Sequence, residues 1–267
     1  MDLELQGKRA LVTGGSRGIG KAIARALAQE GVAVALLARD ALRLSDAASE
    51  LAKETGQIVV GVSADTTSDE QVRAAFADAV RQLGGGIDIL VNAAAEPAGY
   101  AGPPKLGDIT ASYFHSEMDT KVMGYIRCAR EAAPHMRQQQ WGRVVNISGL
   151  AARQTGNTVG SMRNIAVAAM TKNLADELGA AGITVNVVHP GLTRTERTAP
   201  LIQARAAAQA IPASEVEARM AAGNSIKQIV DATDVAHVVV FLCSPKAKAI
   251  NGDVITAGGG APNSIHY

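Results

Sequence analysis

The sequence predicts an α/β protein with a Rossmann-type, three-layer αβα fold around one doubly wound, seven-stranded parallel sheet. Short runs of aliphatic and β-branched residues alternate along the chain with longer amphipathic stretches. Strands that are apolar along their whole length are typical of a parallel sheet covered by helices on both faces. The length of 267 residues favours one such domain over two. We therefore expect residues 1–267 to form a single domain.

Each strand is predicted from an apolar run, and each helix from apolar positions that recur on one face. After the first strand, for example, Ile23, Ala26 and Leu27 share a helix face from which Lys21 and Arg25 point away. The predicted strands are 9–12, 33–37, 58–62, 87–91, 142–147, 184–188 and 252–256, and the predicted helices are 18–30, 40–55, 68–83, 112–138, 160–180 and 231–243.

Two stretches, 95–111 and 190–230, show neither pattern, and both follow predicted strands. The ligand crevice of a doubly wound sheet lies beyond the carboxyl ends of its strands, so we expect both stretches to lie over it. The second stretch carries Pro190, Pro200 and Pro212 and an Ala-rich helical patch. We interpret it as an irregular substrate lid.

The charge balance gives no reason to expect a nucleic-acid or membrane partner. Lys and Arg number 26 against 25 Asp and Glu, a net charge of +1. No run of about 18 apolar residues predicts a membrane span, and the first ten residues lack the apolar core of a signal peptide. Cys128 and Cys243 have no motif spacing and are predicted to be buried thiols. We expect a cytoplasmic location and no metal site.

Gly14, Gly18 and Gly20 lie at the turn from the first predicted strand into the first predicted helix. Free N–H groups at a helix N-terminus, together with the helix dipole, can bind a phosphate. Glycine allows a pyrophosphate to approach the backbone closely. The placement therefore predicts nucleotide binding, and the alternative is a glycine-rich turn that only packs the helix tightly.

The spacing Gly-x3-Gly-x-Gly after Thr13 resembles the classical short-chain dehydrogenase/reductase family. The likeness extends over essentially the whole chain, with a matching motif at each strand end. It implies a dinucleotide-binding domain in which Asp65 accepts from the adenine, Thr193 meets the nicotinamide carboxamide and Thr195 meets a phosphate. The residues implied to contact the cofactor are Gly14, Ser16, Arg17, Gly18, Ile19, Gly20, Arg39, Asp65, Thr66, Asn92, Ala93, Ala94, Pro190, Gly191, Thr193 and Thr195.

Two arginines favour NADP(H) over NAD(H). The second strand ends at Ala38-Arg39, where a carboxylate would bind the ribose hydroxyls of NAD. Arg17, in the glycine loop, would bring a second guanidinium to the same place. Guanidinium groups bind a phosphate through bidentate hydrogen bonds. The alternative is that both arginines are solvated surface residues.

The resemblance also implies a catalytic Tyr and a Lys four residues later on the same helix. Counting back along the matching helix puts Gly160 at the Tyr position and Asn164 at the Lys position. The chain has four tyrosines, and none has a Lys four residues later. They are Tyr100, Tyr113, Tyr125 and Tyr267.

Ser148 is the candidate for the family's catalytic serine, with Gly149 as the alternative equivalent. Lys121 stands where the family has an asparagine, so positions 121 and 164 show a paired exchange of Asn and Lys. We hypothesise that Lys121 contacts the nicotinamide ribose or a bound ligand. The alternative is a lysine whose stem packs on its helix while its head reaches water. Arg163 could bind an anionic substrate or be a surface residue, and His189 is interpreted as structural.

Three functions remain open at this point. The first is an NADP(H)-dependent oxidoreductase with a non-standard proton relay, acting on a small carbonyl, hydroxyl or enone substrate. The second is an NADP(H)-binding protein without turnover, a sensor or a partner subunit. The third is a lyase or hydrolase that reuses the pocket. The resemblance implies a homotetramer, or otherwise a homodimer, assembled through helices 112–138 and 160–180.

Overall fold

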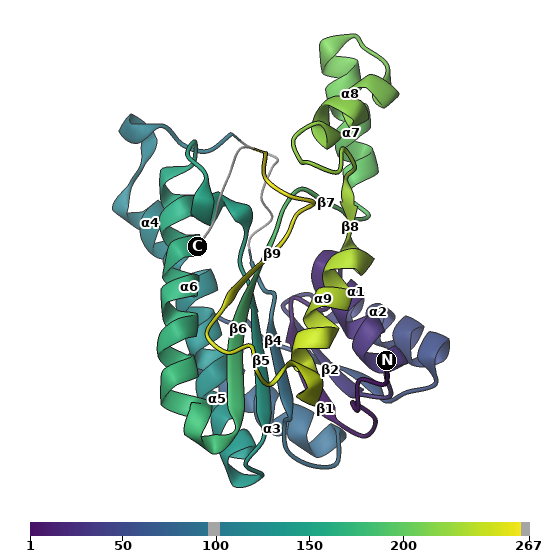
Figure 1. Cartoon of the computed structure of the whole chain (residues 1–267), viewed down its shortest axis with the longest axis vertical. Coiled ribbons are helices and arrows are strands. Elements are labelled where there is room, and N and C mark those ends of the chain that lie inside the picture. Colours follow the sequence, from purple (N-terminus) through teal and green to yellow (C-terminus); the bar gives the residue numbers. More distant parts are fainter. Residues whose placement is uncertain (96–101, 263–267) are drawn as a thin grey trace.

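The computed structural model describes residues 1–95 and 102–262. Seven parallel strands form one sheet in the order β3-β2-β1-β4-β5-β6-β9 (Figure 1). All seven predicted strands are confirmed, with ends that differ by one or two residues because strand ends are not marked by the apolar run alone. Their bounds are β1 Arg9–Thr13, β2 Ala33–Ala38, β3 Val59–Ser63, β4 Ile89–Asn92, β5 Gly142–Ile147, β6 Ile183–Pro190 and β9 Val254–Ala257.

Helices cover both faces of the sheet (Figure 1). One face packs against α1 (Gly18–Gln29), α2 (Ala41–Thr55) and α9 (Ala232–Cys243). The other packs against α3 (Asp69–Gln82), α5 (Gly124–Gln138) and α6 (Thr158–Leu178). Cys128 and Cys243 are buried thiols in these layers, as predicted. Short 3-10 turns lie at Leu106–Asp108, Leu150–Arg153, Gly179–Ala181 and Pro245–Ala247.

The order in which successive strands are added across the sheet reverses at β1, which pairs with both β2 and β4. Thr13 at its carboxyl end lies in register with Leu37 on one side and Asn92 on the other. Ligands of doubly wound sheets bind in the crevice at such a switch point. The glycine loop that follows Thr13 therefore lies at the position where the fold provides a binding crevice.

The helix predicted over 112–138 is interrupted. It consists of α4 (Ala111–Met118), a π-turn (Asp119–Met123) and α5. A π-turn shifts the helical hydrogen bonds from i+4 to i+5, and such turns are common at functional sites. The apolar spacing continues through the segment, so the pattern contains no sign of the interruption.

The interpretation of 190–230 as irregular is wrong in part. It contains α7 (Thr198–Gln209), α8 (Ala213–Ala221) and a short pairing of β7 (Thr193–Arg194) with β8 (Val230–Asp231). Pro200 lies in the first turn of α7 and Pro212 precedes α8, where a missing N–H costs little. The two helices share a small apolar core and project beyond the sheet at the top of Figure 1.

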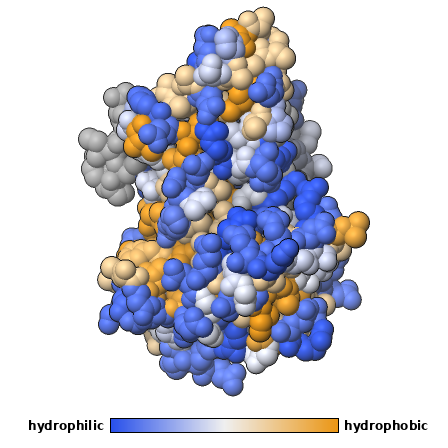
Figure 2. Space-filling model, turned by 90° about the vertical axis from the view of Figure 1, so that its right-hand side faces the viewer, coloured by the Kyte–Doolittle hydropathy of each residue, from blue (hydrophilic) through white to orange (hydrophobic). Residues whose placement is uncertain are grey.

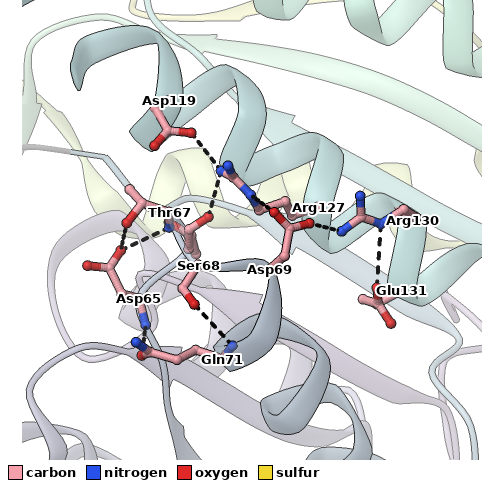
Figure 3. A network of polar contacts seen from close by, with 10 residues as sticks. Asp65, Thr67, Ser68, Asp69, Gln71, Asp119, Arg127, Arg130 and Glu131 are labelled. Atoms are coloured by element: carbon pink, nitrogen blue, oxygen red, sulfur yellow. Dashed lines mark hydrogen bonds and ion pairs between the residues drawn. The ribbon is translucent and has the colours of Figure 1, made fainter. Parts of the chain in front are cut away.

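A network of charged residues joins α5 to the loop after β3 (Figure 3). The Arg127 guanidinium donates to Asp69 Oδ2 at 3.1 Å and to the Thr66 carbonyl at 3.1 Å, and it pairs with Asp119 Oδ1 at 2.8 Å. Its side chain is 10% exposed. Because Asp119 begins the π-turn, Arg127 fixes that turn against the loop holding Thr66.

The outer surface on the side of α1, α8 and α9 is mainly hydrophilic, with separate apolar patches (Figure 2). Among the described residues, no helix is long and apolar enough to cross a bilayer. Within the same ranges, no group of three His, Cys, Asp or Glu side chains is placed to hold a metal ion.

We predict that Arg127→Met lowers the free energy of unfolding by about 1–3 kcal/mol, because two aspartates and a carbonyl lose a charged donor. Chemical denaturation followed by circular dichroism measures this change. The matched control is Arg130→Met, which removes a half-exposed partner of the same Asp69. Its loss should be clearly smaller, because solvent screens a half-exposed ion pair, and equal losses for the two variants would contradict the role given to Arg127.

Candidate active site

A cavity of about 850 Å³ lies at the carboxyl ends of the strands. Its wall comes from the glycine loop, the ends of β2, β4, β5 and β6, the π-turn, the start of α6 and the end of α8. Every residue predicted to contact the cofactor lines this cavity except Asn92. The structure therefore brings together positions that are up to 181 residues apart in the sequence, Gly14 and Thr195 among them.

Close backbone packing explains the glycines of the loop. A Cβ at Gly14, where φ is +66°, would lie 2.7 Å from the Ala93 carbonyl oxygen, and one at Gly20 would lie 2.3 Å from the Gly14 carbonyl oxygen. Thr13 Oγ1 accepts from the N–H groups of Ala93 at 2.9 Å and Ala94 at 3.0 Å. The loop is thus held tightly against the end of β4.

The N-terminus of α1 already holds an anionic group of the protein. Glu196, which follows β7, accepts from the Gly18 N–H with Oε2 at 3.1 Å. A carboxylate at this place demonstrates that the first turn of α1 presents an N–H to an anion, as helix N-termini do. The residues present therefore fit the pyrophosphate of a dinucleotide.

Three arginines line the cavity, Arg17, Arg39 and Arg43. Arg39 and Arg43 follow β2, and Arg17 precedes α1. No sequence motif marks Arg43. Nearby, Asp65 Oδ1 accepts from the Thr67 N–H and Oγ1, both at 2.9 Å. Burial alone would raise the pKa of Asp65, but these hydrogen bonds and the charge of Arg39 hold it below the usual value.

The side chain of Asn92 does not line the cavity. Its side chain is fully buried, and its Nδ2 donates to Asn146 Oδ1 at 2.9 Å. Asn146 in turn donates to Thr171 Oγ1 at 2.9 Å. The side chain of Asn92 therefore ties β4 to β5 and α6 behind the wall.

Lys121 is buried at the inner end of the cavity, with 4% of the residue exposed. The π-turn presents it to two acceptors. Its Nζ donates to the Ser148 carbonyl at 3.0 Å and to Asn164 Oδ1 at 3.2 Å. The alternative of a lysine head in water is therefore excluded, and positions 121 and 164 are in direct contact.

The environment of Lys121 shifts its protonation into the neutral range. Burial lowers the pKa of Lys121 from 10.5 to about 7, the charge of Arg163 also lowers it and Glu117 raises it. Arg163 and Glu117 form an ion pair with side chains 12% and 14% exposed. Near pH 7 the amino group can thus both release and accept a proton, as a general acid or base requires.

Ser148 and His189 are held by hydrogen bonds around this lysine. Ser148 Oγ donates to the Asn164 carbonyl at 3.2 Å, and the Gly149 N–H donates to His189 Nδ1 at 3.1 Å. Burial and the charges of Arg153 and Lys121 lower the pKa of His189 to about 4. His189 is therefore a neutral acceptor that positions the strand end, in agreement with a structural role.

Gly160 is buried, and the side chain of Asn157 occupies the space beside it. Asn157 caps α6, because its Oδ1 accepts from the Gly160 N–H at 2.8 Å. The sequence analysis missed Asn157, although an Asn at the start of a helix is a strong cap signal. Tyr125 is buried and donates to the Ile147 carbonyl at 2.8 Å. Neither Tyr113 nor Tyr125 lines the cavity, and Tyr100 and Tyr267 lie outside the described residues.

Comparison with known proteins assigns the family. Residues 14–262 match the family described as enoyl-(acyl carrier protein) reductase. A 3-oxoacyl-[acyl-carrier-protein] reductase, FabG, of Aquifex aeolicus (strain VF5) is 33% identical over 264 residues, covering 97% of this chain and 99% of the relative. The chain belongs to the classical short-chain dehydrogenase/reductase family.

Solved structures of this family share the fold closely. L-sorbose reductase from Gluconobacter frateurii, complexed with NADPH and L-sorbose, superposes with a TM-score of 0.91 at 29% identity, over 99% of this chain and all of the other. A variant of actinorhodin polyketide ketoreductase with NADPH gives 0.86 at 30% identity, over 96% of this chain and 98% of the other. TM-scores of this size over nearly whole chains show that both share the fold described above.

We predict that Glu117→Gln lowers the pKa of Lys121 below its value near 7, because the carboxylate that favours the ammonium is removed. An NMR titration of ¹³C-labelled lysine side chains measures this pKa. Glu177→Gln is the matched control, since Glu177 is exposed on α6 and pairs with Arg137. A Lys121 titration unchanged by Glu117→Gln, or moved equally by both variants, would refute this electrostatic account.

Proposed function

We propose that this short-chain dehydrogenase/reductase reduces a small carbonyl compound with NADPH and takes the proton from Lys121 in place of a tyrosine. The observation that carries the proposal is the buried Lys121 amino group, held between Ser148 and Asn164 in the wall of the cavity. As an oxidoreductase with NADP(H) as its cofactor, the protein still needs a proton donor. Lys121 lines the cavity and has a pKa of about 7, which suits that task.

Bound NADPH would supply the hydride for the carbonyl carbon. The chain's own residues would hold it: the glycine loop with the N-terminus of α1 at the pyrophosphate, and Thr193 and Thr195 at the nicotinamide end. Arg17 and Arg39 would bind the 2′-phosphate, because a guanidinium group can donate two parallel hydrogen bonds to a phosphate. All of these residues line one continuous cavity.

The proton would pass from the Lys121 ammonium to the carbonyl oxygen. An ammonium has three N–H donors, and among the described residues Ser148 and Asn164 take two of them. The third is then available to a substrate oxygen. Lys121 becomes a neutral amine, a form that its lowered pKa makes accessible, and solvent returns the proton.

Two further features are part of the proposal. Met220, Gly223 and Asn224 lie at or just after the end of α8 and line the cavity, which supports a lid role for 190–230.

Met123, Met162 and Ile165 expose 41–54% of their surfaces on the helices named for assembly. Apolar side chains exposed in this way support a homotetramer, or otherwise a homodimer.

We predict that Lys121→Met lowers kcat for NADPH oxidation by about 10²–10⁴-fold, the usual contribution of general acid catalysis. The panel of substrates includes L-sorbose, a 3-oxoacyl thioester and a cyclic enone, and absorbance reports NADPH oxidation. For the native protein, kcat/KM should fall as the pH rises above about 7, because the protonated form of Lys121 is required. This alkaline limb should be absent in Lys121→Met.

Lys172→Met is the control, since Lys172 is an exposed lysine paired with Asp176 on the outer part of α6. It should keep the native rate and pH profile. Tight NADPH binding without oxidation of NADPH by any member of the panel would instead favour a binding protein without turnover. Turnover with no change in nicotinamide absorbance would favour a lyase or hydrolase.

We predict that Arg39→Asp lowers kcat/KM for NADPH by about 10–100-fold, as expected for the loss of one charged hydrogen-bond partner. The same change should raise kcat/KM for NADH, because a carboxylate at this place can bind ribose hydroxyls. Arg25→Ala, on the outside of α1 and paired with Glu50 and Glu54, is the control. An unchanged ratio of NADPH to NADH use in Arg39→Asp would exclude a 2′-phosphate contact.

A further inference from the structure

We infer that the Asn157 side chain binds the substrate's carbonyl oxygen through its Nδ2 group while its Oδ1 caps helix α6. This inference rests on the proposed function and extends it to a residue outside the family motifs. Asn157 lines the cavity and stands in the extended conformation that precedes a helix. A primary amide has two N–H donors and one acceptor oxygen, so the two ends of this side chain can serve different partners.

The acceptor end of Asn157 is committed to the protein. Its Oδ1 accepts from the Gly160 N–H at 2.8 Å and so satisfies a backbone donor of the first helical turn. This bond fixes the amide plane, so the Nδ2 group has one orientation. Within residues 1–95 and 102–262, Nδ2 has no acceptor of its own. A fixed and unpaired donor in a cavity wall is a group to which a ligand oxygen can bind.

The absence of a side chain at Gly160 leaves room for the Asn157 amide in the cavity wall. A Cβ at residue 160 would lie 2.5 Å from Asn157 Nδ2 and 2.6 Å from its Cγ, both too close for contact. The amide therefore fills the volume where any side chain of residue 160 would begin. The absence of a side chain at 160 is what allows an amide from the preceding turn to reach the cavity.

The helix geometry puts Asn157 on the same side as the proposed proton donor. Residues 157, 160 and 164 follow the i, i+3, i+7 spacing that lines one helix face. Asn164, the last of the three, hydrogen-bonds Lys121. A carbonyl oxygen bound by this face would therefore have Asn157 Nδ2 as a neutral donor and the Lys121 ammonium as the proton source. Fixed donors of this kind stabilise negative charge that develops on oxygen.

The test separates the cap from the donor. Asp and Ser are, like Asn, good cap residues, but neither carries the amide N–H. We expect Asn157→Asp and Asn157→Ser to keep the native melting temperature and NADPH affinity, while kcat/KM for the best panel substrate falls about 100-fold, as after loss of an oxyanion donor. The loss should lie mainly in kcat, because the contact strengthens as charge develops. Asn157→Ala should lose both the activity and thermal stability.

A second variant tests the role of the space at 160. Gly160→Ala places a methyl group against the amide but suits a helix better than glycine. We expect an unchanged or higher melting temperature with kcat/KM lowered at least about 10-fold. The same substitution in the Asn157→Ser background should cause little further loss, because the group that it displaces is already gone.

The outcomes distinguish this inference from the proposed function. A native protein that oxidises NADPH, with Asn157→Asp and Asn157→Ser retaining kcat/KM within about threefold, would leave Asn157 as a cap alone and overturn the inference only. A native protein inactive on the whole panel would overturn the proposed function and this inference with it. NADPH binding measured by fluorescence, together with the melting temperature, excludes damage to the fold as the cause of any loss.

Discussion

The burial of the Lys121 amino group constrains the structure around it. A cation removed from water needs hydrogen-bond acceptors at close range. The acceptors come from two other elements, the Ser148 carbonyl after β5 and the Asn164 amide on α6. They reach the lysine because the π-turn brings position 121 inward, and Arg127 holds that turn through Asp119. The carboxyl edge of the sheet, two helices and the charged network around Arg127 therefore contribute to one contact.

The two ends of the cavity are formed by different parts of the chain, backbone groups at one end and side chains at the other. At the cofactor end, backbone groups form the site, since the glycine loop packs so tightly against β4 that no Cβ fits at Gly14 or Gly20. At the inner end, side chains define the chemistry, and the charges of Glu117 and Arg163 act on the protonation of Lys121. The family resemblance is strong where backbone shape matters. The positions at which the resemblance implies a different residue, Lys121, Gly160 and Asn164, lie around the proposed proton donor.

Much of the fold could be predicted from the sequence because the information is local. The buried strands are apolar along their length, and the positions that end them converge on one edge of a parallel sheet. The sequence therefore predicts one cavity for residues as far apart in the chain as Arg39 and Thr195, and both line it. A strand-end amide such as that of Asn92 can turn either toward the cavity or toward a neighbouring strand, and here it bonds to Asn146. Sequence alone does not determine that direction.

Other features depend on contacts that no local pattern encodes. The π-turn continues the apolar spacing of the helices on either side, so only its backbone hydrogen bonds, such as that from the Gly124 N–H to the Asp119 carbonyl, reveal it. Helices α7 and α8 pack mainly on each other around Ile202 and Val216. Their prolines are residues that in a sequence usually indicate a loop. The amide of Asn157 is defined by its bond to Gly160 across one helical turn. In each case the deciding information is a three-dimensional distance.

The contacts among positions 121, 157, 160 and 164 also limit how the sequence can change over time. A lysine at 164 would bring a second ammonium against that of Lys121, whose Nζ lies 3.2 Å from the present side chain. A tyrosine at 160 would collide with the Asn157 amide. An asparagine at 121 would be too short to reach both acceptors of the lysine. The resemblance implies a tyrosine at 160, a lysine at 164 and an asparagine at 121, and each single substitution toward that arrangement meets an obstacle left by the other residues, so these four positions are expected to be inherited together.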